Sequence, residues 1–221
     1  MSELFNLEKI LGICEKICYF WLINFMFVVS NLPVLVFFMF VGIHRVRTYL
    51  PLFLLCMVFM APALSAVFYA MNLLVRGTEG KTVRDYMRGY LRDYRQKLIL
   101  GAGQMLLVFI LWTNLEFFSL HVKSIGLTIV TVLLLAAVIL VTPNLYMLVT
   151  RYEMKNLRII KTAVVLMVAR PVMTLGNVVA LGIILMAFEL SAGTTVLFMG
   201  SVYGFLVMFM NQRVLNELES Q

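Results

Sequence analysis

Residues able to do acid–base or metal chemistry are few and scattered in this sequence. The two histidines, His44 and His121, have no carboxylate and serine at a spacing typical of a catalytic set. A metal site built from them with Glu116 or Glu189 would match no known ligand-spacing pattern. The sequence also has no Walker A loop and no Gly-x-Ser-x-Gly motif. We therefore expect a protein that is not an enzyme and that holds no cofactor and no metal.

Glu116 and Glu189 adjoin long apolar stretches, near the ends of those stretches. Two interpretations stay open for them. Each can be an interfacial carboxylate that faces Arg45, Arg47 or Lys123. Alternatively, they are the polar groups of an outer vestibule that takes up a proton or a substrate, because acidic residues in membrane segments are often functional.

The segment 82–97 carries the densest pattern of charged and aromatic residues. On one helix its arginines share a face and its tyrosines form a second stripe. Thr82 is expected to cap this helix, with Asp85 three residues later. The pattern fits lipid head groups or a protein docking surface, and we do not expect nucleic acid. The residues expected to contact a partner or lipid are Arg84, Tyr86, Arg88, Tyr90, Arg92, Tyr94 and Arg95.

The composition shows which kind of molecule must position these residues. Of the 221 residues, 62% are hydrophobic and 13% are charged, with a mean hydropathy of +0.98. A soluble domain is about half apolar and a quarter charged. The sequence therefore excludes an ordinary soluble enzyme, a disordered chain and a disulfide-stapled module, and it predicts an integral membrane protein. The three cysteines, Cys14, Cys18 and Cys56, match no zinc pattern and are expected to be reduced.

Long apolar stretches predict an all-α fold, a single membrane domain over residues 1–221 with about six spans. The expected spans are 17–42, 50–75, 98–118, 125–149, 171–190 and 195–210. The expected additions are an interfacial helix over 1–16, a cytoplasmic basic-aromatic helix over 76–97 and a second cytoplasmic basic segment over 150–170. Pro171 suits the first turn of the fifth span, which leaves Arg170 at the interface.

The distribution of Lys and Arg predicts the orientation. The net charge is +7, and most cationic residues lie in segments 76–97 and 150–170. Loops 43–49, 119–124 and 191–194 hold few. Because cytoplasmic loops are enriched in Lys and Arg, we expect both termini to be cytoplasmic.

Neutral polar residues inside the spans are expected to tie helices together rather than bind solute. These are Asn24, Asn31, Gln104, Asn114, Asn144 and Asn177. Gly200 and Gly204 form a Gly-x-x-x-Gly motif, which we expect to serve packing within the chain.

Several motifs resemble the YesL-type family of bacterial integral membrane proteins of unknown function. That family carries a proline-led span, an Arg-Gly-x-Glu-Gly turn and an aromatic-basic helix. The corresponding residues here are 61–70, 74–80 with Arg76-Gly77-Thr78-Glu79-Gly80, 84–90 and 94–96. Asn31-Leu32-Pro33 and the stretches 143–145 and 151–152 are also similar. Residues 34–38, Val-Leu-Val-Phe-Phe, depart from the small and threonine residues usual there.

The resemblance implies a protein of the bacterial plasma membrane, often encoded beside ATP-driven carbohydrate importers, and it implies no established activity. We expect a non-enzymatic accessory protein that contacts permease or ATPase subunits of an oligosaccharide importer through residues 82–97. The alternative is an independent small-solute or proton-coupled transporter that uses Glu116 and Glu189. The oligomeric state does not follow from the sequence.

Overall fold

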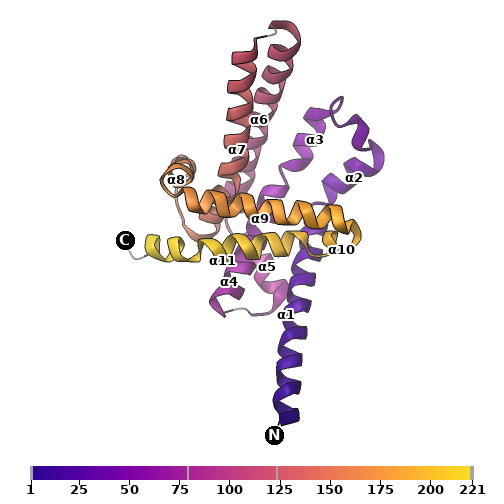
Figure 1. Cartoon of the computed structure of the whole chain (residues 1–221), viewed down its shortest axis with the longest axis vertical. Helices are drawn as coiled ribbons and strands as arrows, with labels where there is room; N and C mark the ends of the chain where they lie inside the picture. The colour runs from indigo at the N-terminus through magenta and orange to yellow at the C-terminus, as the bar shows by residue number, and fades with distance from the viewer. Residues whose placement is uncertain (1, 79, 123, 220–221) are drawn as a thin grey trace.

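The computed structural model describes residues 2–78, 80–122 and 124–219, and all regular structure in these ranges is helical (Figure 1). This confirms the all-α prediction. The first half contains α1 Ser2–Ser30, α2 Leu32–Phe40, η1 Ile43–Arg45, α3 Leu50–Met57, α4 Met60–Arg76, α5 Thr82–Leu91 and α6 Tyr94–Phe117. The second half contains η2 Phe118–Val122, α7 Ile125–Arg151, α8 Asn156–Ala169, α9 Pro171–Leu190, α10 Ala192–Val196 and α11 Met199–Glu219.

Among the described residues, five helical segments are long and apolar enough to cross a membrane. The chain is therefore a multi-pass membrane protein. The stretch 195–210, expected as a sixth span, is not among them, because it is divided between α10 and α11 and its apolar part ends at Asn211. The five segments are Leu11–Ser30, Leu50–Arg76, Tyr94–Val122, Ile125–Arg151 and Pro171–Leu190.

The first expected span, 17–42, is not one continuous helix. α1 ends at Ser30, and α2 begins at Leu32 with Pro33 in its first turn, where a proline needs no backbone N–H donor. Asn31 lies between them, and its side-chain amide donates to the Phe27 carbonyl at 2.8 Å. At the other end of the predicted stretch, residues 2–16 continue into α1 without a break, so they are not a separate helix.

α4 is the central helix of the molecule, and every residue from 61 to 68 is buried. Small residues allow its neighbours to approach closely. A Cβ atom placed on Gly101 of α6 would lie 2.6 Å from the Ala61 Cβ, and one on Gly204 of α11 would lie 2.5 Å from the Val67 Cγ1. Both glycines are therefore required by close helix packing. The Gly204 contact confirms that the Gly-x-x-x-Gly motif serves packing within the chain.

The long helices do not share one direction. In Figure 1, the α6–α7 hairpin extends to one end of the molecule and the first part of α1 extends to the opposite end. α9 and α11 lie side by side and cross between them. α9 begins at Pro171 with Arg170 before it, as the sequence predicted.

Candidate functional site

The expected 82–97 helix is divided in the structure. α5 ends at Leu91 and α6 begins at Tyr94, with Arg92 and Asp93 between them. Asp93 has a φ of 51°, in the left-handed region that an L-residue rarely adopts. The prediction of a single helix with one basic face was therefore wrong, since the break turns the chain between Arg88 and Arg95.

The start of α5 also differs from the prediction. Lys81, not Thr82, occupies the N-cap position, and no side chain caps the helix there. The buried Asp85 carboxylate instead reaches back to accept the Gly80 backbone N–H at 2.8 Å. This bond satisfies a backbone donor just outside the helix, as the second half of a capping box does.

Tyr86 is a core residue, although the sequence suggested a surface position. Its side chain is fully buried, and its hydroxyl donates to the Ser30 Oγ at 2.9 Å. Tyr86 therefore contacts neither lipid nor an external partner and instead joins α5 to the end of α1. Burial raises the pKa of its hydroxyl well above the ordinary value.

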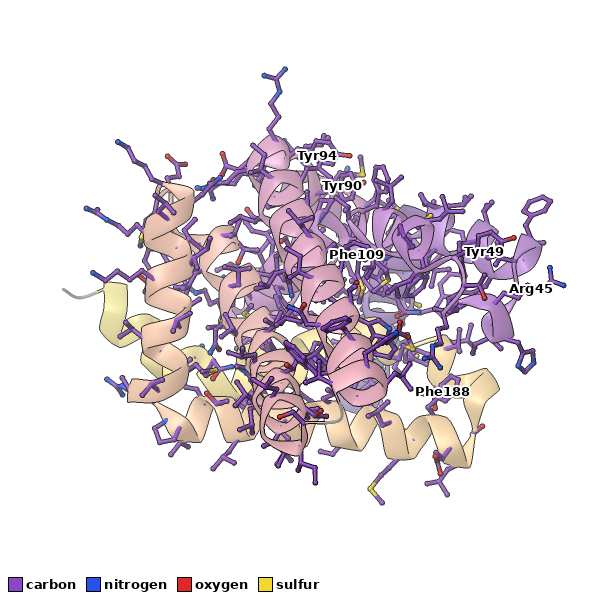
Figure 2. All side chains as sticks on the ribbon, turned by 90° about the horizontal axis from the view of Figure 1, so that it is seen from above. Arg45, Tyr49, Tyr90, Tyr94, Phe109 and Phe188 are labelled. Atoms are coloured by element: carbon purple, nitrogen blue, oxygen red, sulfur yellow. The ribbon has the colours of Figure 1, made fainter. Side chains whose placement is uncertain are left out.

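The remaining two tyrosines continue from Tyr86 across the helix break. Ring centroids are 6.1 Å apart between Tyr86 and Tyr90, and 5.5 Å apart between Tyr90 and Tyr94. Figure 2 shows Tyr90 and Tyr94 next to each other near the start of α6. Burial, together with the neighbouring Tyr94, raises the pKa of Tyr90 to about 12. The three tyrosines therefore form a stripe, which runs from the buried Tyr86 to the half-buried Tyr90 and Tyr94.

Two contacts lock α5 against its neighbours. Gly89 faces α4 so closely that an added Cβ atom would lie 2.7 Å from the Tyr69 Cβ. The fully buried Lys97 donates its ammonium group to the Gly89 carbonyl at 2.5 Å. The carbonyl lies in the last turn of α5, at the negative end of the helix dipole, which offsets part of the cost of burying this ammonium group. The sequence of segment 76–97 gives no sign that Lys97 is buried.

The arginines divide into two groups. Arg84, Arg88 and Arg95 are exposed. Arg92 is half-buried and bonds to Glu153 at 2.8 Å, and it lies 3.7 Å from the Asp93 carboxylate. We call the three exposed arginines, Arg84, Arg88 and Arg95, the basic rim.

The basic rim lies beside the second basic segment. Besides the Arg92–Glu153 ion pair, Gln96 donates its side-chain amide to the Met154 carbonyl at 2.6 Å. Both bonds join the α5–α6 connection to the turn between α7 and α8. The two segments that the sequence treated separately are therefore joined by these two bonds.

The two candidate acids, Glu116 and Glu189, have different surroundings. The Glu116 Oε1 accepts hydrogen bonds from the Arg47 Nε at 2.6 Å and from the Trp112 indole N–H at 3.3 Å. Of the three predicted cationic partners, Arg47 is therefore the one that pairs with Glu116. Arg45 is exposed at the edge of the molecule (Figure 2). Lys123 is outside the described residues. Glu189 is exposed near the end of α9.

The histidines occupy unrelated positions. His44 is exposed in η1, and His121 stacks on the Phe117 ring with centroids 5.3 Å apart. Within residues 2–78, 80–122 and 124–219, no cluster of three or more His, Cys, Asp or Glu side chains could hold a metal ion. The three cysteines are free thiols.

Four of the six neutral polar residues join helices, as predicted, namely Asn24, Gln104, Asn144 and Asn177, whereas Asn31 bonds only to the helix before it and Asn114 is exposed. Asn24 of α1 donates to the Val196 carbonyl and accepts the Gly200 N–H, both at 2.8 Å. Gln104 of α6 bonds to Thr142 at 2.6 Å and Tyr146 at 2.7 Å, both on α7.

A third set of polar contacts includes Asn211, a residue that the sequence analysis did not single out. Asn144, Asn177 and Asn211 form a buried chain of amide hydrogen bonds from α7 through α9 to α11. Asn211 was missed in the sequence because it follows the last apolar run and reads as the start of a polar tail.

The comparisons with known proteins identify one similarity. Residues 20–115 match the model of a family described as protein of unknown function, DUF624. The comparisons with curated proteins and with solved structures found no match. The matched region runs from α1 to the last turn of α6, and it includes α4, α5 and the basic rim. This part of the chain is therefore similar to a protein family of unknown function.

Proposed function

We propose that this protein is a non-enzymatic membrane partner of an ATP-driven oligosaccharide importer and a YesL-type protein of the bacterial plasma membrane. In this proposal both termini and α5 are cytoplasmic, and the basic rim contacts a permease or ATPase subunit. The resemblance of residues 61–96 to the YesL-type family, within the matched region 20–115, supports the family and the importer context.

The docking proposal rests on the way in which the helix that bears the basic rim is held against the rest of the protein. Arg84 and Arg88 project from a short helix whose opposite face is fixed by Tyr86, Gly89 and the Lys97 ammonium. Arginine on a rigid base loses little side-chain entropy on binding and can form bidentate bonds to carboxylates. An acidic surface on an importer subunit is the complementary partner.

The test is co-purification from native membranes of cells grown on plant polysaccharide. The tagged protein is extracted in a mild detergent, and importer permease and ATPase subunits are quantified by mass spectrometry. The test variant replaces Arg84, Arg88 and Arg95 by Gln. Arg92 is kept, because its bond to Glu153 holds the fold of the connection.

A matched control removes the same number of charges from the neighbouring segment, with Gln at Lys155, Arg158 and Lys161, which are all exposed. We expect the rim variant to lose importer subunits at least about tenfold, a change of about 1.4 kcal/mol in binding. The control should lose less than about threefold. Equal recovery with both variants, or no importer subunit with the unmodified protein, would contradict the proposal.

A further inference from the structure

An apolar cavity of about 340 Å³ lies between α1, α4, α7, α9 and α11. Its floor is buried and includes Phe27 and Leu64. Its rim is exposed, with Ile139 51%, Val178 43% and Met199 36% accessible. Ile139 and Val178 belong to α7 and α9, two of the five candidate spans, and the exposed apolar faces of such spans meet hydrocarbon in a membrane protein. The cavity therefore opens toward lipid, and its volume is in the lower part of the range for ligand pockets.

None of the described residues that line the cavity is an acid or a base that is charged at neutral pH. A charged group that entered would lose its hydration without gaining a counter-ion, which is strongly unfavourable. An uncharged hydrogen-bonding group can be accommodated, because Thr142 and Asn177 are among the lining residues. The lining thus selects an uncharged amphiphile.

Asn177 is held in a fixed orientation at the cavity floor. Its Nδ2 donates to the Asn144 Oδ1 at 3.0 Å, and its Oδ1 accepts from the Asn211 Nδ2 at 2.8 Å. A side-chain amide has two N–H donors and two carbonyl lone pairs. These two bonds leave one donor and one acceptor position of the Asn177 amide unused, and a ligand hydroxyl that reaches the amide from the cavity can bond to either.

We propose that this cavity binds a membrane lipid with an uncharged, hydroxyl-bearing head group, of the diacylglycerol class. The hydroxyl bonds to the Asn177 amide, and the first part of the acyl chains lies along α9 past Val178 and Leu181. The lipid enters from the hydrocarbon through the rim. This site is separate from the basic rim and does not depend on the proposed importer partner.

The experiment uses the full protein in lipid nanodiscs with three photoreactive lipids that share the same diazirine-bearing acyl chains. The first is diacylglycerol, the second is its acetylated form without the hydroxyl, and the third is phosphatidic acid with a charged head. Labelled residues are located by mass spectrometry at equal mole fractions. We expect diacylglycerol to label residues that line the cavity at least about fivefold more than either of the others.

Two variants on α9 separate the cavity from the general lipid surface. Leu181→Trp places a large side chain in the lining, whereas Leu185→Trp makes the same change one turn later, at an exposed position outside it. We expect Leu181→Trp to lower diacylglycerol labelling at least about fivefold and Leu185→Trp to change it less than about twofold. Thermal unfolding of both variants verifies that the fold is kept.

Three outcomes would overturn the proposal. Equal labelling by all three lipids would mean that the cavity is filled by ordinary bulk lipid. Labelling mainly outside the cavity would place the lipid elsewhere. An equal effect of the two tryptophan variants would show that the cavity is not the site.

Discussion

At the scale of single residues, the Tyr86 hydroxyl joins α5 to the end of α1 through its bond to Ser30. We expect Tyr86→Phe to lower the free energy of unfolding by about 0.5–1.5 kcal/mol, the usual net value of one hydrogen bond. Ser30→Ala should cost a similar amount, and the double variant should cost little more than either single one. Denaturation of the four proteins in detergent measures this coupling, and strictly additive losses would mean that the bond contributes nothing.

Gly89 is required by the close approach of α5 to α4. Gly89→Ala would place a Cβ atom 2.7 Å from the Tyr69 Cβ, so we expect a loss of about 1–3 kcal/mol from overpacking. Gly103→Ala on α6 is the matched control, because an added Cβ atom there meets nothing within 4 Å. It should leave stability unchanged or raise it by up to about 1 kcal/mol. Similar melting temperatures for the two variants would argue against the packing account.

Glu116 allows a direct test of the transporter alternative. Its ion pair with Arg47 is partly exposed, so we expect Glu116→Gln to change stability by less than about 1 kcal/mol. If Glu116 serves only this ion pair, proteoliposomes of the variant will show the same proton and sugar flux as the unmodified protein. A flux that is present in the unmodified protein and lost in Glu116→Gln would instead support transport through an outer vestibule.

At the scale of elements, the break between α5 and α6 is the clearest difference from the sequence prediction. Arg92 and Asp93 are neither Gly nor Pro, so the helical pattern of 82–97 continues through them without a stop signal. The break is stabilised by bonds to Glu153 and Met154, which are remote in sequence. Periodicity cannot reveal such a tertiary cause, whereas the local preference of proline for a first helical turn correctly predicted that α9 begins at Pro171.

The left-handed backbone of Asp93 predicts a pattern of tolerated substitutions. Asn adopts this region more readily than β-branched residues do. We expect Asp93→Asn to be close to neutral and Asp93→Val to lose about 1–2 kcal/mol. Comparing unfolding curves of the two variants checks this, and an equally stable Val variant would mean that the break is not held rigidly.

At the scale of the whole molecule, hydropathy predicted that the chain is a helical membrane protein, because apolar length depends on local sequence alone. The buried amide chain could not be assembled in this way. Asn144, Asn177 and Asn211 lie on three helices and meet only after those helices pack. For the same reason, the cavity beside Asn177 has no signature in the sequence.

The number of membrane crossings decides on which side of the membrane the C-terminus lies. Five apolar helical segments were found among the described residues, and an odd number of crossings would place the termini on opposite sides. The clustering of Lys and Arg in 76–97 and 150–170 favours cytoplasmic termini. We expect a C-terminal alkaline phosphatase fusion to be inactive and a C-terminal fluorescent protein fusion to be bright. The reverse result would mean that α11 does not return the chain to the cytoplasm.

The burial of α4 has a consequence for biogenesis. Val67, Phe68 and Met71 are fully buried, and α11 covers this part of α4 through Gly204, more than 130 residues later in the chain. Until α11 has been synthesised, α4 has an uncovered side that must be shielded by lipid or by the insertion machinery. A ribosome that stops before residue 199 therefore releases a protein with an open centre, which we expect quality-control proteases to remove.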